Sequence, residues 1–153
     1  MLRTFAIDKL AELLAFGEGS PVTGERAKNF TGGVVRIQDL AEEARLAGIA
    51  ELAGIDVYAV TFDPGARTRP HVHPNEQLLY FVDGTGFVAF PGEGEQIVEE
   101  GEAVIVPPCE LHMHGATETA AVCHLAVRMV AATNWSPHVP SKWKKYVLQE
   151  HRH

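Results

Sequence analysis

Short apolar runs separated by glycine and proline follow one another along most of the chain. Residues 55–62, I-D-V-Y-A-V-T-F, alternate in polarity over much of their length, as expected for a strand with one buried face. The other strand-like runs occupy residues 34–37, 77–82, 86–90, 96–99, 103–106 and 120–130, and a short strand is expected near His112. Many short strands bounded by turn-forming residues indicate an all-β barrel or sandwich.

One segment near the start shows helical rather than strand periodicity. Residues 5–16 place Ile7, Leu10, Leu13 and Leu14 at helical spacing and are followed by glycines, which predicts a short amphipathic N-terminal helix. We expect this helix to pack across its own barrel, with binding to a partner protein as the alternative.

Turns and linkers divide the remaining chain. Residues 20–28 are polar and are predicted to form a linker, after which the first strand begins at Phe30. Residues 41–52 are predicted to form a helical or loop insertion between strands. Asp83-Gly84 is a hairpin-type signal between two apolar runs. The predicted division is a helix and linker over 1–29, a barrel over 30–133 and a C-terminal arm over 134–153, with Trp135 and Trp143 packing back or meeting a second subunit.

Length, charge and cysteine content narrow the class of protein. A chain of 153 residues fits one domain with a substantial core. Its net charge of -7 argues against a nucleic-acid partner, because proteins that bind nucleic acid usually carry a basic face. No run of 18 apolar residues occurs, so no membrane partner is expected. Two cysteines do not form a disulfide framework, which favours a cytoplasmic protein with reduced thiols.

Residues 65–84 carry the first candidate site. His71, His73 and Gln77 are all odd-numbered, so in a regular strand they project to the same side. Two imidazoles and an amide oxygen would supply three ligands to a divalent transition metal. Glu76, a more usual ligand type, has the wrong parity unless the strand is bulged.

Three further histidines, His112, His114 and His124, lie on or beside apolar runs downstream. A His-x-His pair taken alone could equally be a solvated face of a strand. Because these additional histidines also lie on or beside apolar runs, a metal site is favoured over a solvated strand face.

Both histidine-rich segments resemble the paired motifs of the cupin superfamily. The first has Gly65, five residues, His71-x-His73 and, later, Gly84, and the second has Gly101, five residues and Pro107, followed by His112. The strings F-T-G-G-V-V-R-I, F-D-P-G-A-R-T, H-M-H-G-A-T, C-H-L-A-V and N-W-S-P-H-V resemble one branch, which includes cupins associated with carboxymuconolactone decarboxylases and bacterial manganese hydroxynitrile lyases.

The resemblance covers about residues 30–139 and has specific implications. It implies an all-β cupin barrel, a double-stranded β-helix or jelly roll. It also implies one divalent metal held by His71, His73, Gln77 and His112, with manganese favoured and iron, nickel, zinc or cobalt as alternatives. His114 and His124 would line the substrate side as candidate catalytic residues. A homodimer or homotetramer is expected, and two departures stand out, with Gln77 in place of the usual Glu and Cys109 in place of the usual Gly.

The neutral ligand set favours Lewis-acid chemistry. Imidazoles and an amide leave a divalent metal with its full charge, where a glutamate would cancel one unit. The first expectation is therefore a metal-dependent lyase acting on a small carbonyl compound or its adduct, with His124 or His114 as the base. A metal-dependent dioxygenase and a non-catalytic ligand-binding or sensor cupin are the alternatives.

Substrate-binding residues follow from the same alternation. Arg128 has the parity of His124, so it is expected to point inward and to bind an anionic group of a small-molecule substrate. An internal ion pair with an acidic residue is the alternative for Arg128. The predicted apolar walls, which could equally be plain core, are Phe62, Leu79, Phe81 and Val88.

Overall fold

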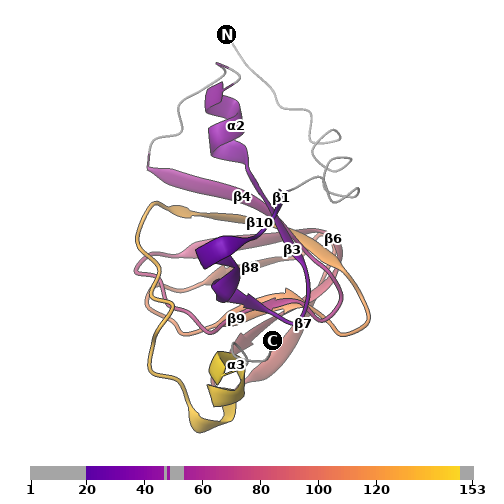
Figure 1. The fold of residues 1–153 in the computed structure, drawn as a ribbon, viewed down its shortest axis with the longest axis vertical. Coiled ribbons are helices and arrows are strands. Elements are labelled where there is room, and N and C mark those ends of the chain that lie inside the picture. Colours follow the sequence, from indigo (N-terminus) through magenta and orange to yellow (C-terminus); the bar gives the residue numbers. More distant parts are fainter. Residues whose placement is uncertain (1–19, 47, 49–53, 149–153) are drawn as a thin grey trace.

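Two antiparallel sheets curl around a common core to form a barrel. The structure is a computed structural model and describes residues 20–46, 48 and 54–148. One sheet contains β1 (Ser20–Pro21), β3 (Val35–Asp39), β4 (Ile55–Phe62), β10 (Val122–Met129) and β8 (Ala103–Val106). The other contains β2 (Phe30–Thr31), β5 (Arg67–Thr68), β9 (Met113–Ala116) and β7 (Gly94–Glu99). The long strand β6 (Gln77–Phe90) belongs to both sheets, and the all-β cupin barrel predicted from the sequence is confirmed (Figure 1).

β6 replaces the hairpin that was predicted around Asp83-Gly84. The chain does not reverse there, because one strand of 14 residues runs through and bends from the first sheet into the second. Gly84 has a φ of 78°, and a Cβ at this position would lie 2.1 Å from the Ala121 carbonyl oxygen, so the bend requires glycine. A register shift between Cys123 and His124 in β10 accommodates the same bend. The hairpin prediction is therefore wrong, since Asp-Gly serves a bend here.

Inward-facing side chains of both sheets form the main core. Phe62, Leu79, Phe81, Val88 and Val106 are buried in one hydrophobic cluster, as the alternation along the strands requires. Burying a large apolar side chain of this kind contributes roughly 1.5–3 kcal/mol. The core thus fills one part of the barrel and leaves the histidines to line the rest.

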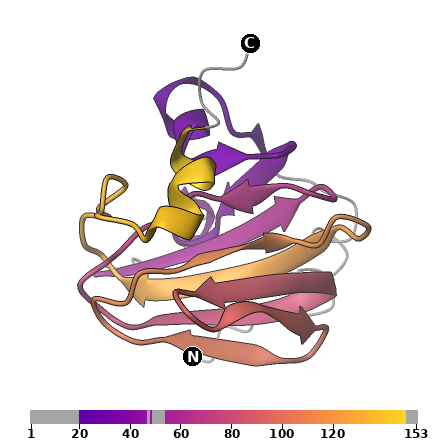
Figure 2. The same cartoon turned by 90° about the horizontal axis from the view of Figure 1, so that it is seen from below.

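The C-terminal arm packs back onto the second sheet. The 3-10 helix η2 (Ser141–Trp143) and α3 (Lys144–Leu148) lie at one end of the barrel, opposite α2 (Leu40–Leu46) (Figure 1). Seen from that end, α3 lies in front of the strands (Figure 2). Trp143 is buried against Phe87 and Met113. The Arg67 guanidinium lies over the Phe87 and Tyr146 rings, 4.5 and 4.9 Å from their centroids, and pairs with Glu95 at 2.8 Å. These contacts join the arm to the barrel.

The N-terminal part of the described chain differs from the predicted linker. Ser20–Pro21 pairs with β3 as strand β1, and Gly24–Asn29 forms the 3-10 helix η1. The sheet therefore begins before Phe30. The helix predicted over residues 5–16 lies outside the described residues. Within the described part of the chain, no helix is long and apolar enough to cross a membrane.

Candidate metal centre

His71 and His112 face each other across two backbone hydrogen bonds. The amide of each donates to the carbonyl oxygen of the other, at 3.1 Å in both directions. The two imidazole rings consequently lie 4.2 Å apart, measured between centroids. The His73 ring lies 4.8 Å from that of His112. One ligand nitrogen from each of these three buried residues lies within 4.8 Å of the others, close enough to hold one metal ion.

The backbone fixes which nitrogen each of the three imidazoles presents. In every case Nδ1 lies within hydrogen-bonding distance of a carbonyl oxygen two residues away. These oxygens belong to Arg69 for His71 (2.7 Å), Asn75 for His73 (2.9 Å) and Glu110 for His112 (2.9 Å). A carbonyl only accepts, so Nδ1 carries the hydrogen and Nε2 keeps its lone pair. This outer hydrogen bond is the arrangement that orients imidazole ligands in metal sites.

Gln77 adds an oxygen to the same group. Its Oε1 lies 3.1 Å from His73 Nε2, and its side chain is buried whereas that of Glu76 is exposed. With His73 Nδ1 donating to the backbone, Oε1 and Nε2 are both acceptors, so they repel unless a cation lies between them or the amide turns its NH2 inward. His112 Nε2 is also buried and has no hydrogen-bond partner among the described residues. A bound metal would satisfy all of these lone pairs, and the residues present therefore fit one.

Gln77 was predicted from regular strand pairing through residues 71–77. The structure does not have this regular pairing, so that part of the prediction is wrong. His71 and Val72 form isolated bridges, and residues 73–76 leave the ladder before β6 begins. Pro74 has no amide hydrogen and cannot continue the pairing. His73 and Gln77 meet because the chain bends between them, and the carbonyl of Asn75 inside this bend orients His73.

Burial keeps His71 and His112 neutral. Desolvation, followed by the neighbouring charge of His112, holds the pKa of His71 well below its usual value. Desolvation likewise lowers the pKa of His112 to about 4. Neutral imidazole is the form that binds metal, so the apolar surroundings favour the ligating state.

His114 and His124 form a separate pair beside the three ligand-type histidines. His114 Nδ1 lies 3.0 Å from His124 Nε2, and both side chains are buried. Burial lowers the pKa of His124 to about 4 and holds that of His114 well below its usual value. The Phe62 ring lies against both imidazoles, at 6.0 and 5.3 Å between centroids. The structure therefore places the two predicted catalytic residues in contact with each other.

A hollow of about 100 Å3 opens in front of these residues. Its lining includes His71, His73, Gln77 and His114 but not His124, which lies behind His114. Phe62 is the one predicted apolar wall that lines it. Leu79, Phe81 and Val88 are fully buried in the core cluster instead, because they lie further along β6. The hollow thus combines imidazoles, an amide and the guanidinium groups of Arg26 and Arg128 with apolar side chains.

Comparison with known proteins identifies the family. Residues 58–128 match the model of the cupin domain. The chain is 35% identical over 124 residues to an (R)-mandelonitrile lyase from Granulicella tundricola, covering 79% of this chain and 90% of the relative. The chain belongs to the cupin superfamily. A cupin-like protein from Thermotoga maritima is similar in structure, with a TM-score of 0.66 and 28% identity over 85% of this cupin and 94% of that chain. The polyketide cyclase RemF from Streptomyces resistomycificus shares the fold, with a TM-score of 0.63 and 17% identity over 94% of this cupin and 91% of that chain.

Arg128 is one of the residues that line the cupin's hollow. It is the cross-strand neighbour of Gln77 on β6 and of Asp56 on β4. Its Nη2 lies 3.7 Å from Asp56 Oδ2. The positive charge of Arg128 also contributes to the lowered pKa values of His71 and His112, after burial and closer groups. Arg128 therefore points into the hollow, as predicted from the sequence, and also forms the alternative ion pair, with Asp56.

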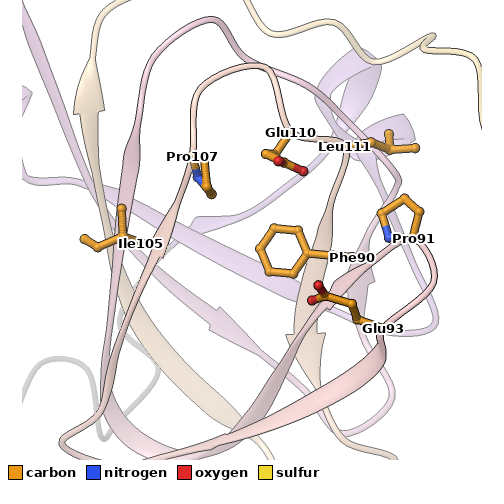
Figure 3. Close-up of a pocket in the computed structure, with 7 residues that line it drawn as sticks. All are labelled: Phe90, Pro91, Glu93, Ile105, Pro107, Glu110 and Leu111. Atoms are coloured by element: carbon orange, nitrogen blue, oxygen red, sulfur yellow. The ribbon is translucent and has the colours of Figure 1, made fainter.

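A second hollow, on another part of the cupin, has different chemistry. It measures about 370 Å3 and is lined by Phe90, Pro91, Glu93, Ile105, Pro107, Glu110 and Leu111 (Figure 3). Its polar side chains are two carboxylates, and none of the described histidines lines it. Although it is larger than the histidine-lined hollow, it offers no group of ligand nitrogens. The candidate metal centre therefore belongs to the smaller hollow.

Sequence reasoning missed several residues that line the histidine-lined hollow. Tyr58 and Val60 on β4 share the parity of Phe62, so the alternation that pointed to Phe62 could have found them. Trp135 stacks on His71, with 4.4 Å between ring centroids. No pattern of strand alternation could predict that contact, because Trp135 follows β10 and returns through a bridge between Val72 and Asn134.

Proposed function

We propose that this cupin is a metal-dependent lyase that breaks or forms a carbon–carbon bond beside a hydroxyl-bearing carbon, as in hydroxynitrile cleavage. The observation that carries the proposal is the convergence of three backbone-anchored imidazoles beside a second, mutually bonded histidine pair. The 35% identity to an (R)-mandelonitrile lyase over most of both chains supports the same reaction class.

The three ligand-type histidines and Gln77 would hold the metal. When bound, a divalent metal supplies Lewis acidity, which lowers the pKa of a substrate hydroxyl and stabilises negative charge on its oxygen. The protein holds His71, His73 and His112 in the required tautomer before any metal arrives, because each Nδ1 is already bonded to the backbone.

His114 is the base in this proposal. Its Nδ1 is engaged by His124, so Nε2 is the nitrogen left to take the hydroxyl proton. As the proton moves to His114, the C–O bond becomes a carbonyl and the adjacent carbon–carbon bond breaks, with its electron pair leaving on the nitrile carbon. His114 then returns the proton to the cyanide, giving an aldehyde or ketone and hydrogen cyanide. His124 accepts a hydrogen bond from His114 and stabilises its protonated form, acting as a positioning residue.

The hollow orients the rest of the substrate. Phe30, Val60, Phe62 and Trp135 supply apolar and aromatic surface beside the histidines. An aryl or alkyl group packed there would direct the hydroxyl toward His114. The same surface limits the water that reaches the reacting atoms.

The test combines metal analysis with a carbon–carbon cleavage assay. Protein made without a polyhistidine tag is expected to bind about one equivalent of a divalent transition metal and to release benzaldehyde from mandelonitrile, followed by ultraviolet absorbance. Stripping the metal should abolish the activity, and adding the metal back should restore it. Oxygen uptake with substrate and no cleavage of aromatic or aliphatic cyanohydrins would overturn the lyase proposal in favour of a dioxygenase. Ligand binding without any turnover would instead indicate a sensor cupin.

A further inference from the structure

The structure leaves a guanidinium incompletely satisfied beside the candidate metal centre. The Arg128 side chain is only 15% exposed and lines the same hollow as His71, His73 and Gln77. Its Nη1 is buried and has no hydrogen-bond partner among the described residues. An arginine offers five N–H donors, and burying them without acceptors is costly.

Asp56 does not meet this need. The closest approach, 3.7 Å between Arg128 Nη2 and Asp56 Oδ2, is longer than a hydrogen bond. The Asp56 carboxylate offsets part of the Arg128 charge through space but leaves the Nη1 donors free. A bidentate partner would have to approach from the hollow, because β4 and β6 flank Arg128 within the sheet.

The charge of the neighbouring site points to an anion. Three neutral imidazoles and an amide add no negative charge to a bound divalent cation. Arg128 would then be a second cation close to the first, since its cross-strand neighbour Gln77 is one of the ligands. Two neighbouring cations are most readily accommodated when an anion lies between them.

We infer that Arg128 binds the carboxylate of the natural substrate, which is a short 2-hydroxy acid or the corresponding 2-oxo acid. Arg128 and Gln77 are directly opposed on β10 and β6. An acid that carries its oxygen function on the carbon next to the carboxylate would present both groups to these two neighbours. The apolar remainder would lie against Val60, Phe62 and Ala126. This inference rests on the proposed function for the position of the metal-directed oxygen.

The reaction of such a substrate balances in the same way as that of a cyanohydrin. The hydroxyl proton passes to His114, and the hydroxyl-bearing carbon becomes the carbonyl of a 2-oxo acid. The electron pair of the broken carbon–carbon bond leaves with the third substituent of that carbon, and this fragment takes the proton from His114. Arg128 holds the carboxylate throughout and exchanges no proton.

A binding experiment with matched probes tests the inference. Mandelate and mandelamide differ in the acid group alone, and their affinities for the metal-loaded protein can be measured by isothermal titration calorimetry. The metal itself favours the acid, so the informative quantity is the ratio of acid to amide affinity. Arg128→Gln is expected to lower this ratio about ten- to a hundredfold and to leave amide affinity little changed. Arg128→Lys, which keeps the charge, should retain part of the preference.

Three further variants keep the experiment decisive. Arg36→Gln is the matched control, because Arg36 lies on β3 beside Ile37 and is not among the residues lining the hollow. It should leave the ratio unchanged. Asp56→Asn removes the competing carboxylate and should raise the ratio, and the double variant Arg128→Gln, Asp56→Asn removes both charges if the single variant folds poorly. An Arg128→Gln ratio equal to that of the wild type would show that Arg128 only balances Asp56, and the inference would be overturned.

The inference and the proposed function fail in different ways. Binding is measured without turnover, so an Arg128-dependent acid preference in a protein that cleaves no hydroxyl-bearing compound would refute the lyase alone. Cleavage of mandelonitrile with no Arg128-dependent preference would refute the anionic substrate alone. An equal loss of preference in Arg36→Gln would show an effect of overall charge and would also overturn the inference.

Discussion

Two neighbouring groups of histidines differ in what holds their rings. Each imidazole of the triad His71, His73 and His112 is anchored through Nδ1 to a backbone carbonyl, and its Nε2 is left for a ligand. In the pair His114 and His124, by contrast, the two rings bond to each other. A carbonyl can only accept, so the triad has one fixed tautomer. An imidazole partner can either donate or accept, so the pair can relay a proton. The chemistry of each histidine therefore depends on the group to which its imidazole is hydrogen-bonded.

Removing a member of the triad should have the largest effect. His112→Ala is expected to reduce metal content from about one equivalent to below about a tenth and to abolish activity, since losing even an outer hydrogen bond to a ligand costs roughly 10–100-fold in affinity. Elemental analysis of purified protein after reconstitution checks this. His138→Ala, at an exposed histidine of the C-terminal arm, is the matched control and should keep the metal. Full occupancy in His112→Ala would break the distinction between the two groups.

Removing the base from the pair should affect turnover but not metal content. His114→Asn is expected to lower kcat about 10²- to 10⁴-fold, the usual contribution of a positioned general base. Metal content measured on the same sample should stay near that of the wild type. A large loss of metal in His114→Asn would mean that His114 acts as a fourth imidazole ligand, and the pair would then belong to the triad.

The pair should also make the metal-free protein sensitive to acid. Burial lowers the pKa of His124 to about 4, so between its ordinary value and pH 4 the unfolded chain binds a proton that the folded chain does not. This contribution to stability is complete above the ordinary pKa and is lost as the pH falls toward 4, by roughly 3 kcal/mol. His124→Leu, similar in volume, should flatten the decline in stability, measured by urea unfolding between pH 7 and 4. Parallel curves for the two proteins would show that His124 does not titrate in this way.

Gln77 offers the smallest and most specific test of the triad. Gln77→Ala is expected to weaken metal binding about tenfold, whereas Glu76→Ala should leave it unchanged because Glu76 is exposed. Competition with a chelator gives both affinities. A larger loss of metal affinity in Glu76→Ala than in Gln77→Ala would show that Glu76 reaches the metal through a rearranged bend. The fourth ligand beside the triad would then be a carboxylate.

The strand alternation predicted most of the barrel, whereas the resemblance to cupins was needed to group His112 with His71 and His73. Residues 55–62 and 103–106 were predicted with the bounds that the structure gives, because each run has clear breakers on both sides. The bend at Gly84 could not be predicted in this way, since Asp-Gly suits a hairpin and a bent strand equally well, and the choice depends on the close approach of Ala121. Parity likewise does not specify that His114 lines the hollow whereas His124 does not.

The position of β6 in both sheets has a consequence for how the protein folds. Its first half pairs with β10 and β8 and its second half with β9 and β7, so neither sheet can be completed before β6 is in place. His71 and His112 come from either side of this strand in the chain and are joined only by their mutual bridge. Such non-local pairing forms slowly, on the order of milliseconds to seconds. We therefore expect the metal to bind after the barrel has closed, so that it slows unfolding far more than it speeds folding.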